Sequence, residues 1–339
     1  MDQGAARALL ALAEEVAPGL KGLDREAAFA RLGERYEELI AALDWFVGEQ
    51  RADESISLAR WLGPFWQATR RLDEATDRFD RALALPGGDD DLRGRGMVEA
   101  GLLWFWRGDD ERATALFEQA LELSRGLEAP TVGALALTGL ARIALRDDDL
   151  AESRRLCVEA LELSESGADP IGRGGAAHVL GVTAQMLGDL NEARRWMSER
   201  VDLARADGNY GGLGMEANNL AMVERQLGNF DRADELSREA LDIFHRRRDE
   251  WAYPFGLSGL AAVAVERGDL GRAATLIGAA DARVQEQGAS WPPDERPHYE
   301  AVVAALETSM DAAELKRARA AGCGLTPDEA VAYALSGAA

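Results

Sequence analysis

The chain has 339 residues, of which 47% are hydrophobic, and its formal net charge is −22 at pH 7. Because a strongly acidic protein repels the phosphate backbone of nucleic acids, we expect no direct contact with DNA or RNA. No apolar run approaches the ~18 residues needed to span a bilayer, and the first residues do not form a secretory signal. We therefore expect a cytoplasmic protein that makes no membrane contact.

The two cysteines, Cys157 and Cys323, are too few for a disulfide framework. Both are expected to be reduced thiols, as is usual in a cytoplasm. Cys157 falls where a helix of the repeats described below packs inward, which predicts that it is buried.

Residues 1–48 predict an N-terminal helical cap. A short helix through Ala13 is expected to end near Pro18. A longer helix is expected to run from Asp24, as its N-cap, toward Phe46, with one apolar stripe along its length. This stripe would cover the open face of the first repeat, because the end of a solenoid needs a cap.

Residues 49–288 contain a short motif that recurs six times. It reads Gly-Asp-Leu-Asn-Glu-Ala at residues 188–193, and its copies end at residues 75, 113, 153, 193, 233 and 273. The spacing is 38 residues and then four intervals of 40. A fixed period of this size indicates a solenoid of repeated structural units.

Each copy has the chemistry of a tight turn between two helices. In four copies a glycine can end the first helix in the left-handed conformation, and the Asp or Asn beside it can accept hydrogen bonds from the next helix. About eleven to thirteen residues before the end of each copy, a small residue lets two helices cross closely. These small residues are Gly63, Gly101, Ala141, Gly181, Ala221 and Ala261.

The pattern resembles the antiparallel helix pair of a tetratricopeptide repeat, lengthened from 34 to about 40 residues; a HEAT-type repeat has this length but lacks this turn. The predicted fold class is all-α. We expect a right-handed superhelical solenoid of about six such pairs with a helical cap at each end. The pairs are expected over residues 51–86, 91–127, 131–167, 170–207, 210–248 and 251–287.

Residues 289–339 predict a C-terminal helical cap. The sequence Trp291-Pro292-Pro293 interrupts the helical pattern, and two or three shorter helices are expected to follow. The last of them opens with Thr326-Pro327-Asp328-Glu329, which is a capping box with proline at the first helical position.

Short segments at both ends of the chain carry a resemblance to a known family. At the start they are residues 10–15, 39–45, 65–66 and 71–75, and at the end residues 273–280, 288–300 and 325–333. They resemble the region that follows the ATPase and winged-helix portions of the bacterial signal-transduction ATPases, so the resemblance covers essentially the whole chain. These are multidomain transcriptional regulators related to the large ATP-binding LuxR-type and antibiotic-regulatory families. The resemblance implies a sensor arm that binds an inducer or a partner protein and relieves inhibition of the ATPase.

The sequence has no Gly-x-x-x-x-Gly-Lys-Ser/Thr motif, so no ATP-binding loop is expected. The ATPase and DNA-binding portions of the regulators are absent. The chain is therefore either the C-terminal region of such a regulator or a stand-alone protein that kept the arm.

No catalytic constellation stands out. The histidines His178, His245 and His298 lie far apart and show no metal-ligand spacing, and two isolated cysteines add no zinc site. Residues 172–177 fit the loose dinucleotide-binding pattern, but they follow a helix where that site needs a strand. Residues 256–259 fall short of a nucleophile elbow. We therefore expect a binding protein, not an enzyme, with no cofactor and no metal.

The first helix of each pair is expected to line the concave face, where side chains spaced by three or four residues point into the groove. Arginine matches carboxylate or phosphate, and tryptophan stacks on planar groups, which predicts a ligand that is partly anionic and partly flat or apolar. The candidate residues are Arg60, Trp61, Gln67, Arg95, Glu99, Trp106, Arg142, Arg146, His178, Gln185, Asn218, Asn219, Met222, Arg225, Gln226, Phe255 and Ser258.

Other aromatic side chains favour the core. Trp66 and Trp104 occupy the position where the repeat buries an aromatic ring. Trp61 and Trp106 are predicted either to be buried or to face the groove, because a shift of one residue in the alignment of the repeats changes which side of the helix they occupy. A lone histidine such as His178 is more often a hydrogen-bonded structural residue than a ligand contact.

Among the polar candidates, Arg142 and Arg146 could instead pair with acidic residues of neighbouring repeats. The adjacent pair Asn218 and Asn219 is the strongest single site, because an amide inside a helix costs helix propensity. Peptide-binding tetratricopeptide repeats use amides at this place to hold a backbone.

Two classes of function stay open. The first is a ligand-sensing and protein-interaction arm of a transcriptional regulator, binding a small-molecule inducer, a peptide or a protein in the groove. The second is a stand-alone protein that sequesters or carries a metabolite such as an antibiotic. An enzyme is a less favoured third, and a homo-oligomer is possible. A ligand that ties successive repeats together would act by changing the superhelical pitch.

Overall fold

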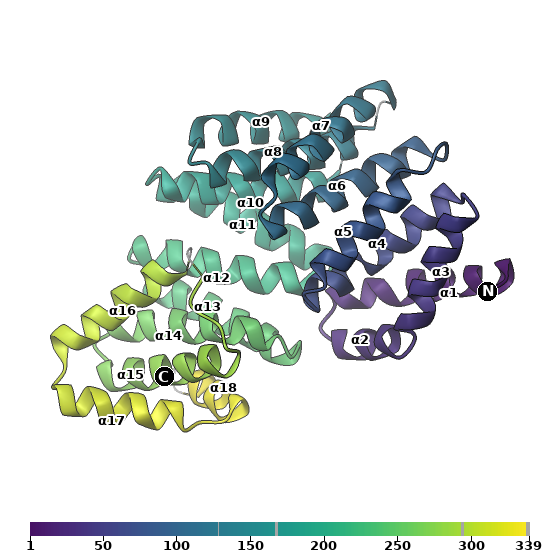
Figure 1. Ribbon diagram of the computed structural model, residues 1–339. Helices are drawn as coiled ribbons and strands as arrows, with labels where there is room; N and C mark the ends of the chain where they lie inside the picture. The colour runs from purple at the N-terminus through teal and green to yellow at the C-terminus, as the bar shows by residue number, and fades with distance from the viewer. Residues whose placement is uncertain (128, 167–168, 293–294, 337–339) are drawn as a thin grey trace. The chain divides into compact units, whose positions relative to one another are not determined.

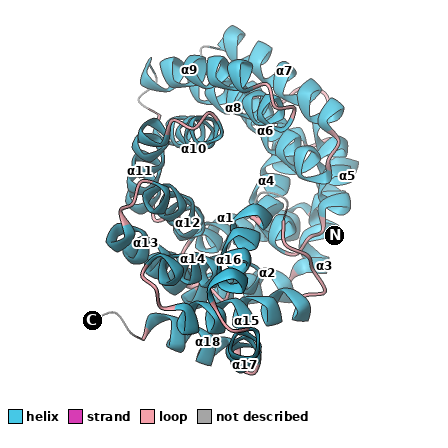
Figure 2. Cartoon of the chain, turned by 90° about the vertical axis from the view of Figure 1, so that its left-hand side faces the viewer, coloured by secondary structure: helices cyan, strands magenta, loops and turns pink. Residues whose placement is uncertain are grey.

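A computed structural model describes residues 1–127, 129–166, 169–292 and 295–336, and all regular structure in these ranges is helical (Figures 1 and 2). None of the helices described is long and apolar enough to cross a membrane. The chain divides into two compact units, Met1–Asp189 and Leu190–Ala339.

The first unit opens with four short elements: α1 (Gln3–Val16), the 3₁₀ turn η1 (Ala17–Lys21), α2 (Arg25–Glu34) and α3 (Tyr36–Gly48). The single helix predicted from Asp24 to Phe46 is therefore wrong. The chain breaks at Arg35, whose backbone angles are φ −108° and ψ 11°, and Asp24 makes no side-chain cap hydrogen bond. The break starts a new helix at Tyr36, whose hydroxyl accepts a 2.8 Å hydrogen bond from Trp66. This contact ties α3 to the first repeat.

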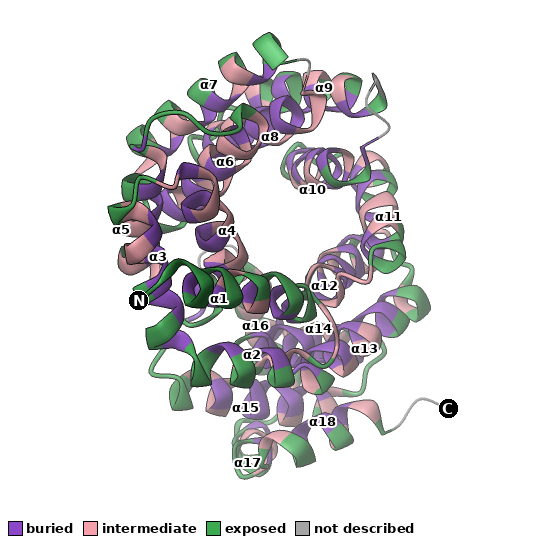
Figure 3. Ribbon diagram, turned by 90° about the vertical axis from the view of Figure 1, so that its right-hand side faces the viewer, coloured by how far each residue is buried: buried purple, intermediate pink, exposed green. Residues whose placement is uncertain are grey.

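Three helix pairs and one further helix complete the first unit. The pairs are α4 (Ala52–Ala68) with α5 (Leu72–Leu83), α6 (Asp90–Arg107) with α7 (Asp110–Leu127) and α8 (Pro130–Arg146) with α9 (Leu150–Ser166), followed by α10 (Pro170–Met186). Helices α4, α6, α8 and α10 contact one another in sequence and form one layer. Helices α5, α7 and α9 form a second layer, and each packs on the first-layer helices on either side of it (Figure 3).

The turns between paired helices have the predicted geometry. Gly108, Gly188, Gly228 and Gly268 have φ angles of 77° to 83°, in the left-handed region that favours glycine. Asp148 takes the same conformation, with φ 61°, although it is not glycine. The neighbouring Asp149 accepts a 3.0 Å hydrogen bond from the amide of Glu152 and so caps the next helix.

The predicted close crossing of helices is confirmed at Gly101, next to Phe117. It is wrong at Gly63, where an added Cβ atom would have its nearest neighbour at 3.7 Å, an ordinary contact distance. The Phe117 ring is fully buried on α7. A Cβ atom added at Gly101 of α6 would lie 2.6 Å from the ring, and one added at Gly139 of α8 would lie 2.4 Å from it. The two glycines therefore leave the space that the ring fills between α6 and α8.

The second unit contains α11 (Leu190–Ala206), α12 (Tyr210–Gln226), α13 (Phe230–Arg246), the 3₁₀ turn η2 (Glu250–Ala252), α14 (Tyr253–Glu266) and α15 (Leu270–Glu286). Three helices follow: α16 (Arg296–Ser309), α17 (Ala312–Cys323) and α18 (Pro327–Leu335). Helix α17 packs on α15, and α18 packs against α13, α14 and α15. The predicted capping box is confirmed, since Thr326 and Glu329 bond to each other's backbone amides.

The predicted all-α solenoid of helix pairs is confirmed. The helices from α4 to α15 fall within the residue ranges predicted for the pairs, apart from shifts of a residue or two at their ends. The assignment of residues 1–48 and 289–339 as caps stays a prediction.

The two thiols are expected to react very differently. Cys157 is fully buried, and burial raises the pKa of its thiol to about 12. Cys323 is exposed, and its thiol donates a 3.1 Å hydrogen bond to the carbonyl of Gly278. Because the thiolate is the reactive form, iodoacetamide at pH 8 should modify Cys323 of the folded chain and spare Cys157. Peptide mass mapping would show this, with the urea-unfolded chain modified at both as the control; equal rates in the folded chain would contradict the assignment.

Candidate functional site

Two candidates of the first unit, Arg60 on α4 and Glu99 on α6, are in direct contact. The Arg60 Nε atom donates a 3.0 Å hydrogen bond to Glu99 Oε1. Burial raises the pKa of the Glu99 carboxyl, and the charge of Arg60 partly opposes this rise. Arg95, one turn before Glu99, donates a 2.7 Å hydrogen bond to Asp91. Both arginines thus have carboxylate partners, which lowers the attraction that they offer to an anionic ligand.

Arg146 pairs with the preceding repeat, as the alternative interpretation predicted. Its guanidinium lies 2.5 Å from Asp110 Oδ1, donates to the carbonyl of Phe105 at 3.0 Å, and sits over the Phe105 ring at 3.5 Å. Arg142, on the same helix, is half-buried, and its charge lowers the pKa of the Cys157 thiol against the larger effect of burial. The Arg146 contacts stabilise the packing of α8 on the preceding repeat.

The aromatic candidates of the first unit divide as follows. Trp66 and Trp104 are buried in the core as predicted, with exposed fractions of 0% and 6%. Trp61 is half-buried and packs on the N-terminal core, whereas Trp106 is 42% exposed. The remaining candidates of this unit are His178 and Gln185, both half-buried on α10, and Gln67, which is exposed.

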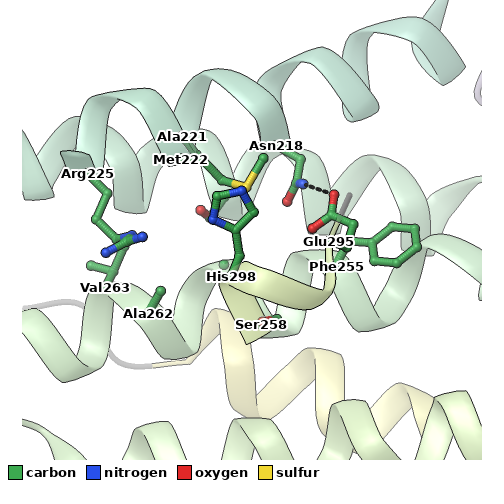
Figure 4. Close-up of a pocket in the computed structure, with 12 residues that line it drawn as sticks. Asn218, Ala221, Met222, Arg225, Phe255, Ser258, Ala262, Val263, Glu295 and His298 are labelled. Carbon is green, nitrogen blue, oxygen red and sulfur yellow. Dashed lines mark hydrogen bonds between the residues drawn. The ribbon is translucent and has the colours of Figure 1, made fainter. Parts of the chain in front are cut away.

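In the second unit, five candidates line one small cavity, with about 20 Å³ open to a water-sized sphere (Figure 4). Asn218, Met222 and Arg225 come from α12, and Phe255 and Ser258 come from α14. The spacing of three to four residues places each set on one helix face. Asn219 is half-buried and Gln226 is exposed, and neither is among the lining residues.

Two polar side chains, Asn218 and Ser237, lie close to Gly259 at the floor of this cavity. Asn218 is 2% exposed and Ser237, on α13, is 1% exposed. A Cβ atom at Gly259 would lie 3.2 Å from Ser237 Oγ and 3.5 Å from Asn218 Oδ1, so the glycine keeps this space open. Among the described residues, the Ser237 hydroxyl has no hydrogen-bond partner. The floor therefore presents a buried amide and a buried hydroxyl.

The two ends of the cavity differ in chemistry. At one end, Arg225 donates a 3.0 Å hydrogen bond to Glu266. At the other end, Phe255 is 3% exposed and packs edge-on against Trp251, with 4.7 Å between ring centroids. Met222 and Val263 contribute apolar surface between these ends. The lining therefore combines polar groups with apolar surface, and a ligand larger than a water molecule enters only if Glu295 and His298 move away.

Glu295 and His298 cover the cavity, and sequence reasoning missed both of them. They belong to the start of α16 and to the residue before it, and Figure 4 shows the His298 ring over the middle of the cavity. The Asn218 amide nitrogen lies 3.5 Å from Glu295 Oε1, at the outer limit of a hydrogen bond. The repeat pattern predicts groove residues on the first helices alone, whereas Glu295 and His298 belong to the C-terminal segment and Ser237 to a second helix.

The segment that covers the cavity, residues 295–299, is held in place by contacts with α15 and α17. Trp291 stacks on Tyr299, with 4.4 Å between ring centroids and 20° between ring planes. The Tyr299 hydroxyl donates a 2.8 Å hydrogen bond to Asp281 on α15, and burial together with this carboxylate raises the pKa of Tyr299 to about 12. Arg319 of α17 donates to Asp281 as well, at 2.6 Å. The position of α16 over the cavity thus depends on α15 and α17.

The fold of this chain is similar to that of known repeat proteins. A tetratricopeptide repeat family model matches residues 217–247. The fold is that of a tetratricopeptide-repeat solenoid. No curated protein matches the chain in sequence.

Many solved structures are similar to this chain, and three of them follow. A Rap protein complexed with competence and sporulation factor has a TM-score of 0.54 at 13% identity, with 94% of this chain and 99% of that chain covered. The apo form of the quorum sensor NprR from B. thuringiensis has a TM-score of 0.50 at 15% identity, with 91% of this chain and 84% of that chain covered.

The third is a signal transduction ATPase with numerous domains and a tetratricopeptide repeat sensor, from Pyrococcus horikoshii. Its TM-score is 0.50 at 13% identity, with 95% of this chain covered. The match spans 55% of that protein, about half its length. At these identities all three likenesses concern the fold.

Proposed function

We propose that the chain is a ligand-sensing and protein-interaction module without catalytic activity of its own, and that its ligand binds in the cavity between α12 and α14. The observation that carries this proposal is Asn218. Its amide is almost fully buried in the middle of a helix and faces the cavity, where its bond to Glu295 is long. A buried amide is costly unless it is well bonded, so this position favours a ligand that bonds to it.

The surroundings of Asn218 define the class of ligand. The Ser237 hydroxyl beside it lacks a described partner, and an amide or carboxylate group of a ligand would satisfy both side chains. Met222 and Phe255 offer apolar surface to the rest of the ligand. A short peptide, or a small carboxylic acid or amide with an apolar body, has this combination.

Glu295 suggests how binding is reported. Its carboxylate oxygen stands where an acceptor oxygen of the ligand would bond to Asn218. A ligand that takes this place displaces Glu295 and shifts the position of α16. Binding then favours one arrangement of the C-terminal helices by the difference in affinity between the two arrangements.

The role in a transcriptional regulator is the finer part of the proposal. It rests on the resemblance of both chain ends to the sensor arm of signal-transduction ATPases. It is supported by the fold shared with a quorum sensor and with an ATPase that carries a tetratricopeptide repeat sensor. In such a regulator, the displaced α16 would change the surface offered to the rest of the protein.

The test is native mass spectrometry of the chain with fractionated lysate of its source organism and with a library of short peptides. We expect a discrete adduct, and we expect Asn218→Ala to weaken its binding about tenfold or more, because a buried ligand hydrogen bond is lost. Asn219→Ala is the matched control, since Asn219 is the adjacent amide and does not line the cavity. Equal binding by the Asn218 variant would place the site elsewhere, and release of a ligand with altered mass would indicate an enzyme.

A further inference from the structure

A second surface of the molecule has the features of a docking groove. In the first unit, α7 and α9 both pack on α8, and a groove of about 960 Å³ runs between them. Apolar side chains from all three helices line it: Leu121, Leu137, Leu140, Ile143 and Leu156. Leu121 and Leu140 are half-buried, so part of this apolar surface is open to solvent.

Carboxylates surround the apolar lining. Six acidic residues line the groove: Glu118, Glu122, Asp147, Asp149, Glu152 and Glu159. Two arginines also line it, and each is paired with these acids. Arg125 lies 3.3 Å from Glu122, and Arg155 lies 2.7 Å from Glu152 and 3.2 Å from Glu159. The groove is therefore apolar at its base and negative at its edges.

The second unit contains the equivalent groove, and there a helix fills it. The repeat period relates α7, α8 and α9 to α13, α14 and α15, since their turn motifs are three intervals of 40 residues apart. Helix α18 packs against all three of these later helices. Ala330, Val331 and Ala334 of α18 are buried. This kind of groove therefore accepts a short amphipathic helix.

Two equivalent positions of the two grooves carry opposite charges. In the filled groove, Arg238 donates to the carbonyl of Leu335 at 2.9 Å, and Arg272 donates to the carbonyl of Ala334 at 2.6 Å. These arginines bind the carbonyl end of α18, where a helix is negative. The positions 120 residues earlier are Glu118 and Glu152, both lining the open groove. A helix that ends as α18 does would be repelled there.

We propose that the groove between α7 and α9 docks a short amphipathic helix of a partner protein, with an apolar stripe along one face and lysine or arginine at its flanks. The apolar stripe covers the leucines of the groove, as α18 does in the second unit. The basic side chains pair with Glu118, Glu152 and the other carboxylates of the rim. This surface lies in the other unit from the proposed ligand cavity, so the proposal does not depend on that site.

The experiment uses the full chain and two helix-stapled, fluorescent peptides. One has the sequence of residues 326–336, and the other carries Asp328→Lys, Glu329→Lys, Ala332→Lys and Ser336→Lys, which keeps the apolar stripe and makes the flanks basic. The groove variant is Glu118→Arg with Glu152→Arg. The matched control is Glu111→Arg with Glu162→Arg, which changes the same charge on the same two helices outside the groove.

We expect the basic peptide to bind the wild type and the control, and to bind the groove variant about tenfold more weakly, because charge pairs at the rim are replaced by repulsion. The acidic peptide should bind the groove variant best. Equal binding of the basic peptide to both variants, or no saturable binding to the wild type, would overturn the proposal. A photo-crosslinker on the basic peptide tests the wild type directly: crosslinks to α7 and α9 support the proposal, and crosslinks confined elsewhere refute it.

Discussion

Gly322→Ala is expected to destabilise the C-terminal helices by about 3 kcal/mol, because the new methyl group would meet backbone rather than a yielding side chain. A Cβ atom at Gly322 of α17 would lie 1.9 Å from the carbonyl oxygen of Thr275 on α15 and 2.8 Å from the amide nitrogen of Ala279. On the other side of the same crossing, a Cβ atom at Gly278 would lie 2.1 Å from the carbonyl oxygen of Arg319. Helices α15 and α17 therefore keep this close contact only because neither position carries a side chain.

Urea denaturation would measure the loss of stability, and hydrogen exchange would locate it in α15 and α17. Gly324→Ala is the control two residues further on. Its Cβ atom would have its nearest contact at 3.6 Å, an ordinary van der Waals distance, so little change is expected. If the two variants were equally stable, the close crossing of α15 and α17 would be wrong.

This substitution also bears on the proposed ligand site. Arg319 of α17 bonds to Asp281, which in turn accepts the hydrogen bond of Tyr299 at the start of α16. Loosening α17 should therefore loosen the segment that places Glu295 and His298 over the cavity. Faster hydrogen exchange in residues 295–309 of the Gly322 variant would show this coupling.

Phe117→Ala is expected to lower the free energy of unfolding by about 3–5 kcal/mol, the usual cost of deleting a fully buried ring. The ring fills the space above Gly101 and Gly139, which have no side chains to close the cavity that it would leave. Chemical denaturation would measure the change. Val158→Ala, at a position 44% exposed on α9, is the control and should change stability little.

A double-mutant cycle sharpens this prediction. Gly139→Ala alone should destabilise the wild type, since its Cβ atom would lie 2.4 Å from the Phe117 ring. In the Phe117→Ala background the same methyl group enters the vacated space and should cost less or become stabilising. Additive effects of the two changes would mean that the ring and the glycine are not in contact.

The ligand cavity shows where prediction from sequence succeeds and where it ends. Asn218, Met222 and Arg225 could be assigned to one face of α12 because helical periodicity is local and fixes which side chains share a face. Glu295 lies 77 residues beyond Asn218 in the chain. No local pattern brings such residues together, since the path of the chain after the Trp291–Pro292 interruption depends on how α16 packs on α14 and α15.

The same limit applies to the N-terminal segment and to the end of the chain. An unbroken apolar stripe from Phe29 to Leu43 predicted one helix, and the break at Arg35 arises where Tyr36 and α3 pack against α4. The capping box at Thr326 predicted where α18 begins but not that it packs against three helices of the repeats.

The sequence by itself thus determined the 40-residue period, the turns and the buried rings at Trp66 and Trp104, because each of these depends on neighbours a few residues away or on one helix face. The tertiary structure decided which repeats carry a cavity, which segment covers it, and which outer groove the chain fills with its own helix. These features depend on contacts between segments tens of residues apart, whose side chains are selected by packing and charge rather than by local periodicity.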